Sequence, residues 1–125
     1  MRVAWGGLAV FCLAFIVFEA VKHGWMAGVS ALAFLILPDL TMLIGAREGG
    51  GGRISPRAVP FYNAAHRAWV PLLLLVGYIF VPIGGVPTWT AGLAWLAHVA
   101  ADRAFGYGLR ERDGSRRVRA VTADR

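Results

Sequence analysis

Four long apolar segments dominate this chain of 125 residues. They cover about residues 3–21, 25–45, 61–81 and 89–107, and each is close to the roughly 20 helical residues that cross about 30 Å of hydrocarbon. Helices are predicted for all four, because a lone hydrophobic strand would leave its backbone groups unpaired in lipid. The content of 58% hydrophobic and 16% charged residues is also too apolar for an ordinary soluble surface. The sequence therefore predicts an all-α membrane protein.

The links between these segments predict how the helices pair. Residues 22–24 are too short for anything but an antiparallel hairpin, and residues 81–88 contain two prolines and two glycines that form a second hairpin turn. Residues 46–60 are polar, include four consecutive glycines and are predicted to be a flexible loop. We expect a four-helix transmembrane domain over residues 1–109, built from two antiparallel hairpins, and a disordered basic tail over residues 110–125.

The basic residues predict the orientation of the bundle. Lys22 is alone on one side, whereas arginines gather on the other, at Arg2, Arg47, Arg53, Arg57, Arg110, Arg112, Arg116, Arg117 and Arg119. By the positive-inside rule, both termini and the middle loop face the cytoplasm, which for a bacterial protein predicts the inner membrane. The tail arginines suit either a topogenic role or contact with anionic lipid, at about 1 kcal/mol each. Nucleic acid is not an expected partner, since no aromatic platform accompanies them.

Ionisable residues inside the apolar segments are the main indication of function. At 1.5 Å per helical residue, Asp39, His66 and Asp102 lie about 9, 6 and 7.5 Å inside the cytoplasmic boundary, with His98 one turn deeper. His98 and Asp102 share a helix face. Pro38 has no N–H to donate, so a kink or break is predicted just before Asp39. The four side chains are therefore predicted to meet in one layer.

Two interpretations of this layer stay open. In the first, His66, His98 and Asp102 bind a divalent transition metal such as zinc, iron or manganese, with Asp39 as a fourth ligand or a catalytic base. In the second, Asp39 and Asp102 pair with the arginines of the same layer, Arg67 and Arg103, and the histidines bind neutral neighbours. At the opposite end, Glu19 is expected to pair locally with Lys22 or His23.

Three motifs resemble one family of proteins. They are Leu37-Pro38-Asp39-Leu40-Thr41-Met42-Leu43, then Tyr62-Asn63-Ala64-Ala65-His66, then the stretch from His98 to Arg110 with Asp102 and Arg103 inside it. Over about residues 3–110 the chain resembles a bacterial family of small four-helix membrane proteins known as domain of unknown function 4260. The resemblance implies a four-helix membrane fold without an established activity. It also implies a polar motif set of Asp39, Asn63, His66, His98, Asp102 and Arg103.

Three function classes follow from the sequence. The first is a non-enzymatic accessory subunit that packs on a larger membrane complex. The second is a membrane-embedded metal site with hydrolase-like chemistry, and the third is a proton or ion pathway through Asp39 and Asp102. Relatives tend to carry a glutamate in the first turn of the first helix, where this chain has Gly6 or Gly7. Its absence slightly favours the accessory role.

Overall fold

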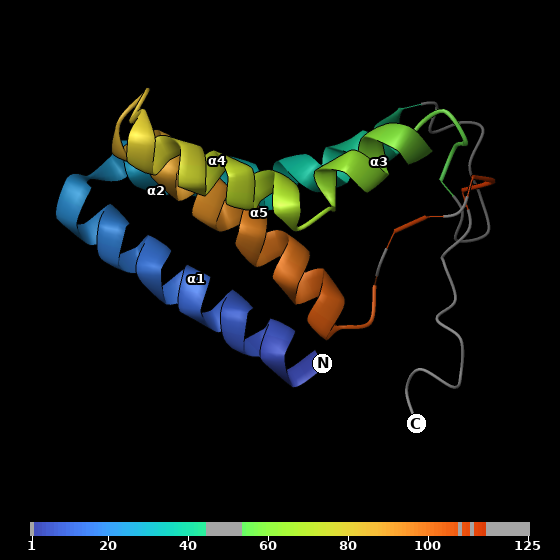
Figure 1. Ribbon diagram of the computed structural model, residues 1–125, viewed down its shortest axis with the longest axis horizontal. Helices are drawn as coiled ribbons and strands as arrows, with labels where there is room; N and C mark the ends of the chain where they lie inside the picture. The colour runs from blue at the N-terminus through green and yellow to red at the C-terminus, as the bar shows by residue number, and fades with distance from the viewer. Residues whose placement is uncertain (1, 45–53, 108, 111, 115–125) are drawn as a thin grey trace.

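A computed structural model describes residues 2–44, 54–107, 109–110 and 112–114. These residues form five α-helices and one short 3-10 helix, without a β-strand, so the predicted all-α class is confirmed. In chain order the elements are α1 (Arg2–His23), α2 (Trp25–Leu40), η1 (Thr41–Leu43), α3 (Val59–Ala65), α4 (Trp69–Phe80) and α5 (Val86–Ala104) (Figure 1).

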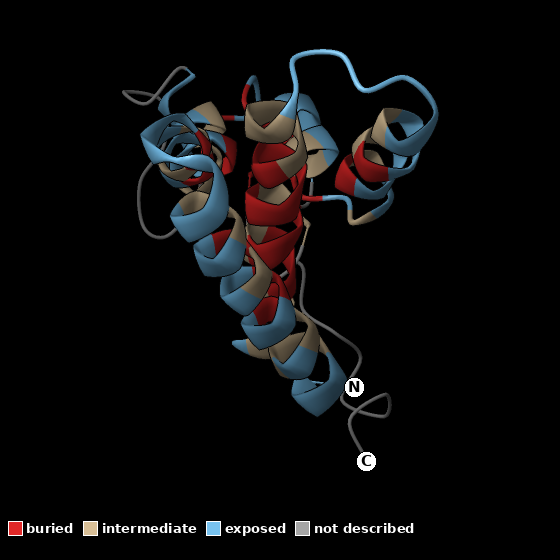
Figure 2. Cartoon of the chain, turned by 90° about the vertical axis from the view of Figure 1, so that its left-hand side faces the viewer, coloured by how far each residue is buried: buried red, intermediate tan, exposed pale blue. Residues whose placement is uncertain are grey.

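Helix α5 is the centre of the molecule. It packs against α1, α2 and α4, and most of its length is buried, as the red ribbon in Figure 2 shows. Its small residues allow this close packing, since alanine and glycine let neighbouring backbones approach. The core beside it is apolar and includes Cys12 and Ile16 of α1, Ala31 of α2 and Leu75 of α4.

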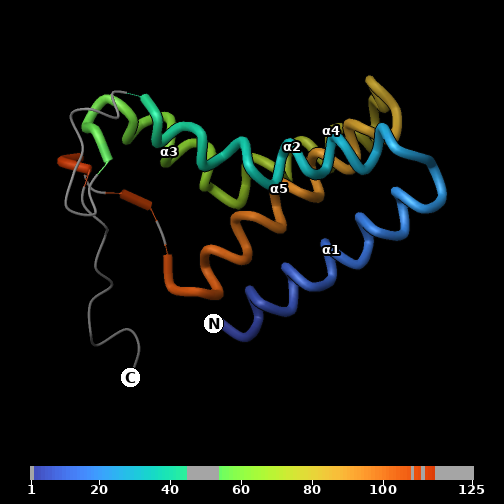
Figure 3. The backbone as a smooth tube through the Cα atoms, turned by 180° about the vertical axis from the view of Figure 1, so that it is seen from behind, coloured from blue at the N-terminus to red at the C-terminus, as the bar shows by residue number. Residues whose placement is uncertain are grey.

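The helices form two hairpins whose turns lie at the same end of the molecule. The α1–α2 turn at Gly24 and the α4–α5 loop lie at one end, whereas the start of α1 and the end of α5 lie at the other (Figures 1 and 3). Two side-chain hydrogen bonds join the hairpins near their turns. Ser30 Oγ donates to the carbonyl of Pro87 at 2.6 Å, and Thr90 Oγ1 donates to the carbonyl of Ala27 at 3.0 Å.

The predicted helix over residues 61–81 is interrupted. The chain leaves the helix after Ala65 and re-enters it at Trp69, giving α3 and α4. Pro71 explains the break, because its ring would clash with the carbonyl of Arg67 in a continuous helix but fits in the first turn of a new one. His66 is thereby placed at the end of α3 rather than inside a long helix.

Pro38 has a milder effect than the sequence predicted. Helix α2 continues through Pro38 to Leu40 and then tightens into η1, so of the predicted kink or break before Asp39 there is no break, and the kink stays a prediction. The missing N–H of Pro38 removes the hydrogen bond that the carbonyl of Phe34 would otherwise accept in the helix. The neighbouring carbonyl of Leu35 lies 2.6 Å from His98 Nδ1 and contributes to the site described below.

Two helices are long and apolar enough to cross a membrane. They are α1 and α2 with η1, at mean hydropathies of 2.1 and 1.8, and they point to a membrane protein. Helix α4 is apolar but short, and α5 carries several polar residues. Among the described residues, four separate spans are therefore not confirmed. Large apolar side chains are nevertheless exposed along the outer helices, among them Val10 and Phe11 of α1, Leu32 of α2 and Leu73 of α4.

Candidate metal centre

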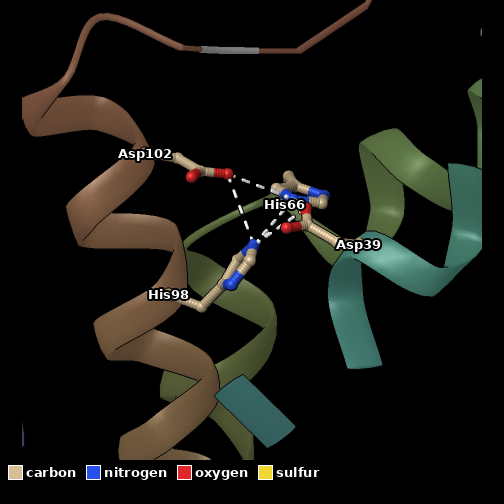
Figure 4. A group of neighbouring side chains, drawn as sticks. All are labelled: Asp39, His66, His98 and Asp102. Atoms are coloured by element: carbon tan, nitrogen blue, oxygen red, sulfur yellow. Dashed lines mark hydrogen bonds and ion pairs between the residues drawn. The ribbon is translucent and has the colours of Figure 1, made fainter. Parts of the chain in front are cut away.

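Four metal-ligating side chains converge from three parts of the chain. Asp39 extends from the end of α2, His66 follows α3, and His98 and Asp102 share one face of α5 (Figure 4). One potential ligand atom from each lies within 4.8 Å of the other three. The layer predicted from helical rise is thus a single cluster, at the end of the molecule where α5 ends (Figure 3).

Five of the six distances among the four ligand atoms are close to those of a tetrahedral metal site. His66 Nε2 lies 3.1 Å from His98 Nε2, and each nitrogen lies 3.2 Å from Asp39 Oδ1. Asp102 Oδ2 lies 3.2 Å from His66 Nε2 and 3.4 Å from His98 Nε2. A tetrahedron with metal–ligand bonds of about 2.0–2.1 Å has edges of about 3.3–3.4 Å. These five edges are therefore close to those of a coordinated zinc-sized ion.

Backbone hydrogen bonds fix the tautomer of both histidines. His66 Nδ1 lies 2.9 Å from the carbonyl of Tyr62, and His98 Nδ1 lies 2.6 Å from the carbonyl of Leu35. A carbonyl oxygen can only accept, so each Nδ1 must carry its proton and donate. In the neutral rings, both Nε2 atoms are then lone-pair acceptors that face one another. In metal-binding histidines, the ring nitrogen that does not contact the metal typically donates a hydrogen bond in this way.

The charge of the cluster also suits a divalent cation. Two facing lone pairs and two carboxylates repel one another unless protons or a metal cation neutralise them. One shared proton would leave the group with a net charge of −1; two protons, or one divalent ion held by two neutral histidines and two carboxylates, make it neutral. Neutrality matters because the histidine side chains are only 3% and 9% exposed, and a buried net charge is costly.

The site is closed at its base and open at one side. The Asp102 side chain is 25% exposed and that of Asp39 is 52% exposed, so the opening lies beside Asp39. An apolar pocket of about 180 Å³ lies next to the ligand-bearing segments and includes Pro38, Ala65 and Trp95 in its lining. Trp95 Nε1 donates to the carbonyl of Ala65 at 2.6 Å, which ties α5 to the chain just before His66.

The two remaining residues of the predicted polar set lie beside the cluster. Arg103 donates to the carbonyl of His66 at 3.4 Å. Asn63 makes two hydrogen bonds to the backbone of Arg110, from Nδ2 to the carbonyl at 2.9 Å and from the Arg110 N–H to Oδ1 at 2.6 Å. The carboxylates of the cluster lie against the histidines, which the arginine-pair interpretation did not predict.

Arg110 corrects an expectation for the tail. The sequence placed it in a disordered, lipid-facing segment, but it is 7% exposed, with its guanidinium 5.3 Å from the ring centroid of Tyr62. Tyr62 in turn stacks on His66, with ring centroids 3.9 Å apart and planes 17° apart. Of the other predicted tail residues, Arg112 is exposed, and three lie outside the described residues: Arg116, Arg117 and Arg119. Arg110 thus supports a metal-ligand candidate.

Comparison with known proteins identifies a family. A family model described as "Domain of unknown function (DUF4260)" matches residues 3–119. The chain belongs to this family. No curated protein and no solved structure matches it. The resemblance seen in the sequence motifs is confirmed, and all four clustered residues of this DUF4260 protein lie within the matched region.

Sequence reasoning missed the groups that orient the histidines. The carbonyls of Leu35 and Tyr62 carry no signal in the sequence, because every residue has a carbonyl and only the fold decides which one is open. The stack of Tyr62 on His66 had a partial signal, since residues four apart share a helix face. No feature of the sequence indicated the contact of Arg110 with this DUF4260 site.

Proposed function

We propose that this protein binds a divalent transition metal ion, with His66 Nε2, His98 Nε2, Asp102 Oδ2 and Asp39 Oδ1 as ligands. The observation that carries the proposal is the pair of Nε2 atoms facing each other at 3.1 Å while both Nδ1 atoms contact backbone carbonyls. Mixed imidazole and carboxylate ligands with tetrahedral spacing favour zinc, and iron or manganese would also accept them.

The proposal includes a membrane setting. We infer that α1, α2 with η1, α3 with α4, and α5 cross the membrane as four spans, with both termini in the cytoplasm. The exposed apolar side chains of the outer helices support it, since a soluble monomer rarely exposes large contiguous apolar surfaces. The metal would then lie near the cytoplasmic face, where Asp39 gives access from water.

This proposal reverses the order of the functions predicted from sequence. The accessory role stays a prediction, with no contact in the described residues that favours it over lipid exposure. The hydrolase-like chemistry also stays a prediction; the open side at Asp39 would suit it. A proton pathway has less support, because the described core between the cluster and Glu19 is apolar.

The metal content of the purified chain tests the proposal. Wild-type protein, extracted in mild detergent without chelator, is expected to hold about one equivalent of a transition metal by elemental analysis. His66→Ala and His98→Ala each remove a ligand and should abolish retention. His23→Ala is the matched control, because His23 pairs with Glu19 at 3.4 Å in the hairpin-turn region at the other end of the molecule.

The metal contents of the wild type and the variants either support the proposed site or overturn it. Loss of metal in the two site variants but not in His23→Ala supports the site, provided that all elute as the same folded species. Wild-type protein that holds less than about a tenth of an equivalent, even after incubation with zinc and dialysis, overturns it. In that case the cluster is a proton-linked polar contact, and the accessory role becomes the leading prediction.

A further inference from the structure

A second pocket opens at the end of the molecule opposite to the candidate metal centre. Its volume is about 360 Å³, and Tyr78, Ile79, Pro82, Val86 and Trp89 form most of its lining. Among the described residues, Glu19 is the one charged residue that lines it. These residues come from the last turns of α1 and α4, the α4–α5 loop and the start of α5. A single carboxylate among apolar and aromatic walls defines its chemistry.

The two basic side chains near Glu19 do not occupy this pocket. The Glu19 side chain is 12% exposed, and its Oε2 lies 3.4 Å from His23 Nε2, one turn along the same helix. Lys22 directs its Nζ to the ring of Phe18, 5.5 Å from the centroid. Neither His23 nor Lys22 lines the pocket. The local pair predicted from the sequence exists with His23, but it does not fill the space beside the carboxylate.

Two aromatic rings complete the wall. The centroids of Tyr78 and Trp89 are 5.5 Å apart, with planes tilted by 36°, and Trp89 is held at its other side by an edge contact with Phe15 at 6.1 Å. The faces of such rings attract organic cations, and tryptophan does so most strongly. A bare metal ion would instead need several oxygen ligands, and Glu19 supplies the pocket's single carboxylate.

We propose that this pocket binds an organic ammonium group, with Glu19 as its counter-ion and Tyr78 and Trp89 as its aromatic walls. The ammonium group comes either from a soluble amine or from the head group of a phospholipid such as phosphatidylethanolamine. The site is separate from the metal centre and does not depend on it. In the proposed membrane orientation it faces the side opposite to the cytoplasm.

Calorimetric titration of the full chain with tetramethylammonium tests the pocket. In a detergent without an ammonium group, Glu19→Gln should lower the affinity at least about tenfold, because it removes the counter-ion but keeps the side-chain shape. Tyr78→Leu should lower it as well and serves as a second variant if the first fails to fold. Asp113→Asn is the charge-matched control, since it removes one exposed carboxylate far from the pocket in sequence, and its affinity should equal that of the wild type.

Bilayer composition distinguishes the two sources. If a lipid head group is the occupant, tetramethylammonium should bind more weakly in phosphatidylglycerol nanodiscs diluted with phosphatidylethanolamine than in nanodiscs diluted to the same surface charge with an uncharged glycolipid. Wild-type protein should also co-purify with more phosphatidylethanolamine than Glu19→Gln does. If a soluble amine is the occupant, the affinity should be equal in both bilayers. Equal binding by wild type and Glu19→Gln, or no binding by wild type together with no difference in retained lipid, overturns the proposal.

Discussion

Replacement of Asn63 by alanine tests whether the chain after α5 positions a metal ligand. The Asn63 side chain holds the backbone of Arg110 by hydrogen bonds of 2.6 and 2.9 Å. At about 1 kcal/mol net for each bond, Asn63→Ala should destabilise the docked segment by about 2 kcal/mol, or about 30-fold in its docking equilibrium. Arg110 would then cover Tyr62 less often, and Tyr62 would restrain His66 less.

The expected effect on the metal is a weaker affinity rather than its loss. Residues that orient metal ligands typically change affinity by about 10–100-fold, and we expect about tenfold here because His66 keeps its hydrogen bond to the Tyr62 carbonyl. Zinc competition with a chromogenic chelator, on the full chain in detergent, measures the dissociation constant. Trypsin cleavage after Arg110, which is buried while the segment is docked, reports release of the segment in the same samples.

Two further variants test whether a change in zinc affinity comes from the hydrogen bonds between Asn63 and Arg110. Asn63→Asp keeps the acceptor for the Arg110 N–H but loses the donor, so its effect should be intermediate. Ser30→Ala removes a hydrogen bond of 2.6 Å to Pro87 near the other end of the molecule and should leave the zinc affinity unchanged. A zinc dissociation constant within about twofold of wild type in Asn63→Ala, with faster cleavage after Arg110, would refute the positioning role.

Two predictions concern packing and topology. A Cβ atom on Gly92 would lie 2.7 Å from Leu75 Cδ2 at the α4–α5 contact, so Gly92→Ala should lower stability by about 1–3 kcal/mol in thermal unfolding. Gly7→Ala, with open space around its Cβ, should not; equal losses would contradict the packing argument. In a cysteine-free background, an impermeant thiol reagent applied to intact cells should label Lys22→Cys but not Arg57→Cys. The opposite pattern would reverse the proposed orientation.

The parts of the fold that depend on local pattern could be predicted from the sequence. Long apolar runs fix helices whatever surrounds them, and a constant helical rise placed Asp39, His66, His98 and Asp102 at a common depth. The i, i+4 spacing of His98 and Asp102 likewise put both on one face before any packing was known.

The parts that depend on distant contacts could not be predicted. Asn63 and Arg110 are 47 residues apart, and nothing in a basic, glycine-containing segment indicates that one arginine is buried while Arg112 is exposed. The effects of proline also depend on the fold. The predicted helix over residues 61–81 is divided before Pro71, which lies in the first turn of α4, whereas α2, which packs against α5, continues through Pro38.

The four clustered residues are divided unequally between the two hairpins. The α1–α2 hairpin supplies Asp39 alone, while His66, His98 and Asp102 all belong to the later half of the chain. Membrane helices insert before they associate, so the second hairpin could acquire a weakly held ion by itself. Docking of the first hairpin would then add the fourth ligand. Assembly of the two halves would then depend on metal supply. An ion present at about 100 times its dissociation constant from the joined state would favour that state by at most about 2.7 kcal/mol, and by less to the extent that it also binds the second hairpin alone.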